Sequence, residues 1–264
     1  MQNKPIGIFD SGLGGLTVLR QMIKQMPYEQ FIYFGDTARV PYGSKSRETV
    51  MRYAIENSVF LLSKEIKALV IACNTASAFA VDTLRSMFKV PVLDVIQPSV
   101  QRAVSLSKSG KIALLGTKAT VASGIYTEKI KALLPEADVT AIACPLFVPI
   151  VEEGFTHHAI AKLAVSEYLH SIKEKGVDTL ILGCTHYPLL TSLISDIIGD
   201  SVSIVDSASS CSEALEKLLS SNELSRKTRL PPENRYFVSD DPEKFSHYSN
   251  LFLGHPISNV EQTS

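Results

Sequence analysis

The chain alternates short apolar runs with longer segments in which apolar residues recur at helical spacing. Each run is close to continuous rather than alternating apolar with polar, which is typical of parallel strands covered by helices on both faces. Eight runs are candidate strands: Ile6–Phe9, Phe31–Phe34, Ala68–Cys73, Val92–Ile96, Lys111–Gly116, Val139–Cys144, Thr179–Cys184 and Val202–Val205.

The segments between these runs predict helices. Between the second and third runs, apolar residues recur at positions 50, 53, 54, 60 and 61, which fits one face of a helix. After the eighth run, Ala214, Leu215, Leu218 and Leu219 repeat the same spacing. Alternating strands and helices favour an α/β fold in which helices form the crossovers between parallel strands.

The eight runs also divide into two sets of four that can be laid over each other. The offset between equivalent positions drifts by only a few residues, and it pairs Cys73 with Cys184 and Asp94 with Asp206. This internal repeat predicts a duplicated α/β unit. In open parallel sheets ligands bind at the carboxyl ends of the strands, which is where both cysteines stand.

Composition narrows the class of protein. The 264 residues are 45% hydrophobic and 20% charged, as expected for a soluble globular protein of one large or two modest domains. The net charge of −1 and the scattered basic residues give no case for nucleic acid or an anionic membrane. No window of about 18 apolar residues predicts a membrane span, and the N-terminus does not resemble a signal peptide, so we expect a cytoplasmic protein with reduced cysteines.

The segment FDSGLGGLTVLRQM (9–22) places a glycine-rich turn after the first strand. It invites a dinucleotide-binding interpretation, but Thr17 stands where that fingerprint needs glycine or alanine, and no Gly-Lys-Ser/Thr follows. The simplest alternative is a turn that only starts a helix. Asp10 and Ser11 nevertheless put a carboxylate and a hydroxyl beside free backbone N–H groups, a combination that suits a small zwitterion.

Four cysteines divide into two kinds. Cys73 and Cys184 each end an apolar run, are followed by polar residues, and are predicted to precede a helix, a location that lowers a thiol pKa. Cys144 is followed by proline and Cys211 falls inside a predicted helix, so both are interpreted as small buried apolar residues.

Several uses of Cys73 and Cys184 compete. A structural metal site wants four ligands, whereas Cys184 with His186 is the only local pairing and no CxxC occurs. A cysteine hydrolase could use Cys184 and His186, which would leave Cys73 idle. Two-base proton transfer at a carbon uses both thiols, one as base and the other as acid. A further hypothesis is a non-catalytic protein that binds an amino acid.

The motifs resemble those of the glutamate racemases, within the cofactor-independent aspartate/glutamate racemase superfamily. Four carry the resemblance: DSGLGG (10–15), YFGDTARVPYG (33–43), ACNTASA (72–78) and GCTHYPLL (183–190). CPLFVPIVEEG (144–154) and YFVSDDPEKF (236–245) also fit that family. Together the matches run from residue 6 to about residue 254.

The resemblance implies an α/β fold of two similar lobes, each with a mainly parallel sheet flanked by helices. It implies that the lobes are related by a pseudo-two-fold axis and hold the active site between them. The C-terminal segment would return to the first lobe, which gives domains of 1–97 plus 208–264 and of 98–207.

The resemblance also implies an activity, namely stereoinversion at the α-carbon of glutamate without pyridoxal phosphate, metal or nucleotide. The product D-glutamate would supply bacterial peptidoglycan, and the resemblance is compatible with a homodimer. A sister racemase acting on aspartate is the nearest alternative.

By motif position, Cys73 and Cys184 would be the paired acid and base, assisted by Asp10, His186 and Glu152. Substrate contacts would come from Asp10, Ser11, Tyr42, Gly43, Asn74, Thr75, Thr117, Thr185 and His186. Two acidic residues also have simpler interpretations: Asp36 could cap a helix or buttress its loop instead of acting directly in catalysis, and Glu152 could belong to a solvated face.

Overall fold

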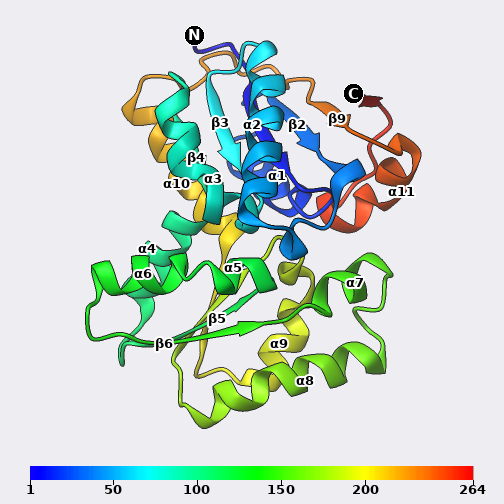
Figure 1. The fold of residues 1–264 in the computed structure, drawn as a ribbon. Coiled ribbons are helices and arrows are strands. Elements are labelled where there is room, and N and C mark those ends of the chain that lie inside the picture. Colours follow the sequence, from blue (N-terminus) through cyan, green and yellow to red (C-terminus); the bar gives the residue numbers. More distant parts are fainter. Residues whose placement is uncertain (264) are drawn as a thin grey trace. The chain divides into compact units, whose positions relative to one another are not determined.

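The computed structural model describes residues 1–263 and divides them into two compact units (Figure 1). Unit 1 holds Met1–Val95 and the chain from Ala208 onward, and unit 2 holds Ile96–Ser207. Within the described residues, no helix has both the length and the hydrophobicity needed to cross a membrane.

Unit 1 is built on a six-stranded sheet in which every neighbouring pair is parallel. The strand order is β10-β9-β2-β1-β3-β4, so the two last strands of the chain extend the sheet beyond β2 (Figure 1). The strands are β1 (Ile6–Asp10), β2 (Phe31–Gly35), β3 (Ala68–Ile71), β4 (Val92–Asp94), β9 (Arg235–Val238) and β10 (Val260–Gln262).

Unit 2 contains a four-stranded parallel sheet of order β6-β5-β7-β8. Its strands are β5 (Lys111–Gly116), β6 (Asp138–Ala143), β7 (Thr179–Gly183) and β8 (Ser203–Asp206). This order repeats β2-β1-β3-β4 of unit 1, with β5 in the place of β1 and β7 in the place of β3. The α/β fold with two parallel sheets predicted from the apolar runs is therefore confirmed.

Helices and short 3-10 turns connect the strands, as the spacing of apolar residues predicts. The predicted helix between the second and third strands is α2, which buries Val50, Ala54 and Leu61 against the sheet. The helices are α1 (Leu16–Gln25), α2 (Arg47–Ser63), α3 (Asn74–Met87), α4 (Ile96–Leu106), α5 (Lys118–Ala122), α6 (Ile125–Leu133), α7 (Phe147–Glu152), α8 (Ala159–Glu174), α9 (Thr191–Ile198), α10 (Ser207–Ser221) and α11 (Pro242–Leu253). The 3-10 turns are η1 (Thr37–Arg39), η2 (Tyr42–Ser44) and η3 (Tyr187–Leu190).

Several predicted strands run too far. The run 68–73 ends as a strand at Ile71, which pairs with Phe9, because Cys73 already turns to cap the following helix. The run 92–96 likewise ends at Asp94, since Ile96 opens α4. Strands β9 and β10 were not predicted, because they are short, and apolar and charged residues mix along them.

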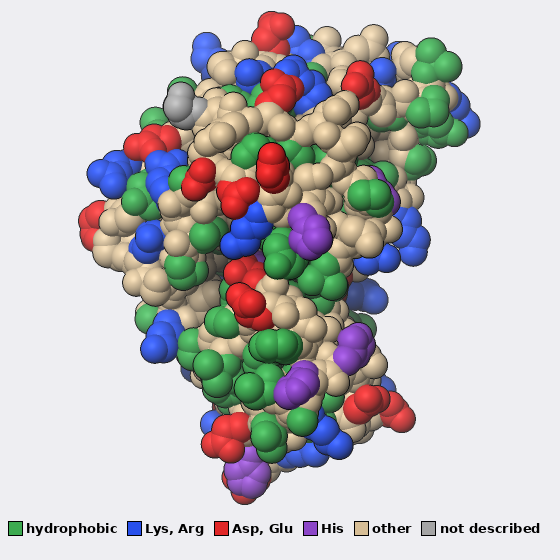
Figure 2. All heavy atoms as spheres, turned by 90° about the vertical axis from the view of Figure 1, so that its right-hand side faces the viewer, with side chains coloured by type: hydrophobic (Ala, Val, Ile, Leu, Met, Phe, Trp, Pro, Cys, Tyr) green, Lys and Arg blue, Asp and Glu red, His purple; other side chains and the backbone are tan. Residues whose placement is uncertain are grey.

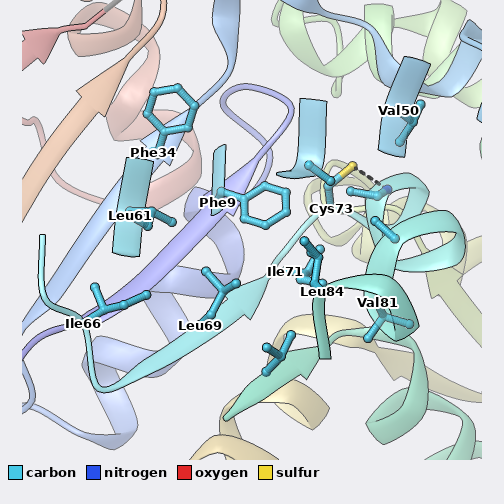
Figure 3. Close-up of a cluster of buried hydrophobic side chains, with 14 of the residues drawn as sticks. Phe9, Phe34, Val50, Leu61, Ile66, Leu69, Ile71, Cys73, Val81 and Leu84 are labelled. Carbon is cyan, nitrogen blue, oxygen red and sulfur yellow. Dashed lines mark hydrogen bonds between the residues drawn. The ribbon is translucent and has the colours of Figure 1, made fainter. Parts of the chain in front are cut away.

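One hydrophobic cluster of unit 1 lies between its sheet and helices α2 and α3 (Figure 3). Phe9, Leu69 and Ile71 from the strands meet Leu61 and Leu84 from the helices, and each of these side chains is fully buried. Burying one such side chain contributes about 1.5–3 kcal/mol. This packing fixes where β1 and β3 end, and therefore where the residues that follow them stand.

The face of the molecule in Figure 2 carries charges of both signs. On the face shown in Figure 2, basic and acidic side chains are interspersed among uncharged ones. This agrees with the net charge of −1 and with the absence of an electrostatic case for binding a polyanion.

A buried ion pair ties the residue before β3 to three other segments. The ammonium of Lys67, whose side chain is fully buried, donates to Glu29 Oε2 at 2.5 Å and to the carbonyl oxygens of Gln2 and Leu224 at 2.8 Å each. The second oxygen of Glu29 accepts from the backbone N–H of Arg226 at 2.7 Å. Every one of these partners lies in unit 1, so the pair joins the first residues of that unit to the segment that follows α10.

Replacing Lys67 by methionine should therefore lower the free energy of unfolding by roughly 3 kcal/mol, because Glu29 would stay buried without its cation. Urea denaturation measures this. The matched control is Lys4→Met, which breaks an exposed ion pair with Glu65 at 3.2 Å and should cost under about 1 kcal/mol. Equal losses in the two variants would contradict this account.

Candidate functional site

The glycine turn after β1 is held by hydrogen bonds around Asp10. This last residue of the strand is fully buried, and its Oδ2 accepts from the N–H of Gly12 at 3.0 Å. The hydroxyl of Tyr33 donates to the carbonyl oxygen of Gly12 at 2.7 Å. A Cβ on Gly15 would lie 2.4 Å from the Cβ of Asp10, so glycine is required there by close approach. The turn thereby fixes the Asp10 carboxylate at the carboxyl end of the strand.

Cys73 is the N-cap of α3, a helix of 14 residues. Its Sγ accepts from the N–H of Ala76 at 3.5 Å, which is the dashed line in Figure 3, and lies 3.8 Å from the hydroxyl oxygen of Ser11. The partial positive charge of a helix N-terminus favours a thiolate at this position. Asn74 and Thr75 begin the helix beside the thiol, and each is 2% exposed. The predicted position of Cys73 before a helix is confirmed.

Tyr42 and Gly43 lie in η2, on the loop that follows β2. The phenol of Tyr42 donates to Asp36 and accepts from Asn57 Nδ2 at 3.1 Å. Burial raises the pKa of Tyr42, and the charges of Asp36 and Cys73 raise it further, so the phenol stays neutral. Tyr42 and Cys73 belong to the same cluster of buried side chains, and η2 packs against α3, which Cys73 caps.

Asp36 buttresses this loop and makes no side-chain cap to η1. It is fully buried, and both of its carboxylate oxygens accept from Arg39 Nε at 2.8 Å. Ser239, just after β9, donates to Oδ1 at 2.9 Å. Of the two interpretations left open by the sequence, the structure therefore supports a buttress.

In unit 2, Cys184 follows β7 directly and is 6% exposed. Its Sγ lies 3.9 Å from His186 Nδ1, and His186 Nε2 lies 2.9 Å from Glu152 Oε1. A Cβ on Gly183 would lie 2.6 Å from Leu114 Cδ1, so glycine allows the tight packing of β7 on β5 that positions the thiol. Glu152, at the end of α7, is thus a partner of His186 rather than part of a purely solvated face.

The environment of His186 makes it a cation. Burial alone would lower its pKa, but hydrogen bonds with Cys184 and Glu152 and their negative charges outweigh burial and raise the pKa to about 10. An imidazolium 3.9 Å from Sγ favours a thiolate at Cys184. The helix predicted to follow Cys184 is wrong in kind, since a 3-10 turn, η3, begins at Tyr187. In unit 2 the positive charge beside the thiol therefore comes from the His186 side chain, whereas in unit 1 it comes from the N-terminus of α3.

The other predicted substrate contacts in unit 2 lie near the carboxyl ends of its strands. Thr117 follows β5 and caps α5, its hydroxyl accepting from the N–H of Thr120 at 3.2 Å. Thr185 is next to Cys184 and is 4% exposed. Unit 1 thus gathers Asp10, Ser11, Cys73, Asn74, Thr75, Tyr42 and Gly43, and unit 2 gathers Cys184, Thr185, His186 and Glu152.

The thiols of the other two cysteines donate to backbone carbonyl oxygens, Cys144 to Ile142 at 3.7 Å and Cys211 to Asp94 at 3.9 Å. Cys144 and Cys211 are both fully buried, as predicted, and burial raises the pKa of the Cys144 thiol. Within residues 1–263, no three or more His, Cys, Asp or Glu side chains are grouped to hold a metal ion. Sequence reasoning missed Asn57, which belongs to none of the motifs, and Ser239, which lies in the segment YFVSDDPEKF (236–245) but was given no role there. Each reaches the loop from another part of the chain.

Comparison with known proteins relates this geometry to a family. The model of the family described as Asp/Glu/Hydantoin racemase matches residues 8–214. A glutamate racemase from Geobacter metallireducens is 49% identical and aligns over 99% of this chain and 97% of its own length. One from Syntrophus aciditrophicus is 45% identical, over 98% and 96%.

Solved structures agree with these relatives. A glutamate racemase isoform from Bacillus anthracis superimposes with a TM-score of 0.97 at 36% identity, covering 100% of this chain and 98% of that one. The glutamate racemase from Francisella tularensis, solved in complex with D-glutamate, gives a TM-score of 0.94 at 40% identity with the same coverage. Because the family match spans most of the chain and these relatives align over nearly all of it, the chain belongs to the Asp/Glu/hydantoin racemase family and is an isomerase, an amino-acid racemase.

Proposed function

We propose that this protein interconverts L- and D-glutamate without a cofactor and supplies D-glutamate for peptidoglycan synthesis in the cytoplasm. The relatives named glutamate racemase and the Francisella tularensis complex with D-glutamate support this substrate. One observation carries the chemistry. Cys73 and Cys184 follow β3 and β7, which hold the same place in two sheets of the same strand order, and each has a group that favours its thiolate.

In the proposed reaction the two thiols act on opposite faces of one α-carbon. A thiolate takes the α-proton, and the electron pair of the broken C–H bond stays on the substrate as a carbanion-like centre. The other cysteine then gives its thiol proton to the opposite face. Each turnover exchanges the protonation states of the two cysteines, so the reverse reaction starts from the state that the forward reaction leaves.

The residues of unit 1 would bind the substrate and support Cys73. Asp10, fixed by the glycine turn, would accept from the substrate ammonium, and Ser11 already lies at 3.8 Å from the thiol. The α-hydrogen of an amino acid is only weakly acidic, so donors that strengthen their bonds as charge develops must stabilise the transition state. Asn74 and Thr75, beside Cys73 at the start of α3, are the nearest candidates.

The residues of unit 2 would support the second base. The His186 imidazolium lowers the free energy of a thiolate at Cys184, and Glu152 keeps the imidazole ring oriented and charged. Thr185 and Thr117 would contribute hydroxyls to the substrate. We further propose a homodimer on the basis of the family resemblance, which a mass measured by light scattering tests directly.

A cysteine hydrolase is the second candidate, because one observation favours it. Cys184, His186 and Glu152 form the order of nucleophile, base and orienting carboxylate that such enzymes use. That function predicts a covalent acyl-enzyme and gives Cys73 no role. The Cys73 thiol nevertheless has its own hydrogen-bond partners, the N–H of Ala76 and the hydroxyl of Ser11. A non-catalytic binding protein predicts ligand binding without any exchange of the α-proton.

The purified protein, incubated with L-glutamate in heavy water without added cofactor, should lose optical rotation toward zero. Deuterium should enter at the α-carbon at the same time, because the incoming proton comes from a thiol that exchanges with solvent. Polarimetry and proton NMR measure the two effects, and L-aspartate run in parallel tests the sister activity. Absence of α-proton exchange with either amino acid would refute proton-transfer chemistry.

Replacing either Cys73 or Cys184 by alanine should reduce kcat for racemisation by at least about 10³-fold, since each direction needs both an acid and a base. Circular dichroism of the substrate follows the rate. The control is Cys144→Ala, which alters a fully buried thiol and should leave kcat within about threefold. Full racemase activity of the Cys73 variant would rule out the two-base mechanism.

The charge of His186 should make stability depend on pH. Because folding raises its pKa from 6.5 to about 10, protonation stabilises the fold fully below about pH 6.5, and this contribution is lost as the pH rises through 10. Removing one cause of the raised pKa by Glu152→Gln should lower the free energy of unfolding by roughly 1 kcal/mol near neutrality, a modest loss because Glu152 is 40% exposed.

The loss in the Glu152 variant should shrink toward zero at pH 10 and above, as measured by urea denaturation across that range. Glu174→Gln is the matched control, because it removes the carboxylate of an exposed pair with His170 at 3.6 Å. A pH-independent difference between the Glu152 variant and the unmodified protein would show that Glu152 does not set the charge of His186.

A further inference from the structure

Two segments far apart in the sequence meet beside the loop that carries Tyr42. Strand β9 pairs with β2 so that Val238 lies opposite Gly35, and the next residues therefore leave the sheet side by side. The N–H of Ser239 donates to the carbonyl oxygen of Gly35 at 3.1 Å. Its hydroxyl donates to Asp36 Oδ1 at 2.9 Å and accepts from the N–H of Ala38 at 2.9 Å. One side chain thus bonds both to the carboxylate and to the backbone of the loop.

A second tie joins the same segments. The hydroxyl of Thr37 donates to the carbonyl oxygen of Asp240 at 2.5 Å and accepts from the N–H of Asp240 at 2.9 Å. The loop after β2 is therefore held on its outer side by residues 239–240, which belong to unit 1 although the whole of unit 2 separates them from the loop in sequence.

The carboxylate of Asp36 connects Ser239 to Tyr42, because it accepts a hydrogen bond from each hydroxyl. It is fully buried between the hydroxyl of Ser239 and the phenol of Tyr42, with Arg39 completing its hydrogen bonds. Asn57 donates to the phenol and accepts from Arg39 Nη2 at 2.9 Å. Because the single phenolic proton is donated to Asp36, the Tyr42 side chain has no donor left for a substrate. Its contribution to binding must come from where it places the backbone of Tyr42 and Gly43.

We propose that Ser239 is a positioning residue, which fixes the loop of Tyr42 and Gly43 through Asp36 in the conformation that receives the substrate. This inference rests on the proposed function, in which that loop contacts glutamate. Ser239 does not itself touch the substrate or the thiols. It supplies a preformed loop, so that binding does not have to order the loop from a mobile state.

Removal of the Ser239 hydroxyl should act on binding more than on the chemical step. In the absence of this hydroxyl, Asp36 would keep Arg39 and Tyr42 as partners. Ser239 is only half-buried, so its replacement should leave the fold intact. The N–H of Ala38 in the loop would lose its acceptor. A loop that must be ordered on binding raises KM while the interactions made by the transition state, once formed, stay the same.

The test is the Ser239→Ala variant of the full chain, assayed for racemisation of L-glutamate and of D-glutamate. KM should rise about fivefold to tenfold in both directions, the effect expected from losing one hydrogen bond, with kcat within about twofold. Ser239→Thr keeps the hydroxyl and should restore KM. Ser246→Ala is the matched control, because that hydroxyl bonds to the carbonyl oxygen of Ile257 in the same C-terminal region without touching the loop.

Thr37→Ala cuts the second tie and should raise KM in the same direction, which keeps the test decisive if Ser239→Ala does not fold. An unchanged KM in these variants, a loss confined to kcat, or an equal rise in Ser246→Ala would overturn the proposal. Failure of Ser239→Thr to restore KM would also overturn it. An unmodified protein that does not racemise glutamate would instead refute the proposed function, before any variant is compared.

Discussion

The rest of the structure depends on one constraint, which is the parallel pairing of the central strands up to their carboxyl ends in each sheet. β3 pairs with β1 as far as Ile71, and β7 pairs with β5 as far as Gly183, so each cysteine emerges where the apolar ladder stops and polar groups begin. Cys144 also directly follows a strand, β6, but it is fully buried, and burial raises the pKa of its thiol. The packing of the strands therefore sets the position of Cys73 and Cys184, and the groups beside each thiol set its surroundings.

The two thiols lie in different electrostatic surroundings. Cys73 Sγ accepts from a backbone N–H at the start of α3, whose dipoles do not titrate. Cys184 Sγ lies beside His186, whose positive charge exists only while the imidazole holds its second proton and whose raised pKa depends in part on Glu152. The duplicated sheets thus place equivalent nucleophilic atoms, while the segments after the strands give them unequal surroundings. A symmetrical backbone does not imply a symmetrical response to pH.

The fold and the cysteines could be predicted because their signals are local. Continuous apolar runs mark buried parallel strands, and the change to small polar residues after Cys73 and Cys184 marks where those strands end. The support of the site could not be predicted in the same way. Glu152 reaches His186 across 34 residues and Ser239 reaches Asp36 across 203, and no spacing rule connects such positions. β9, which carries Ser239 to its place, begins with a charged residue and buries only three positions, so its pattern is too short to stand out.

The strand order of unit 1 also bears on how the protein is made. Chains fold broadly from the N-terminus as they leave the ribosome, yet β9 emerges only after the whole of unit 2. While unit 2 is being synthesised, the sheet of unit 1 can hold only β1 to β4, with β2 left as an open edge. The loop after β2 therefore gains the support of residues 239–240 only after unit 2 has been synthesised. A nascent chain can thus contain both cysteines before the loop beside Cys73 is in its final form. Until β9 pairs with β2, the exposed edge of β2 is open to pairing with another chain.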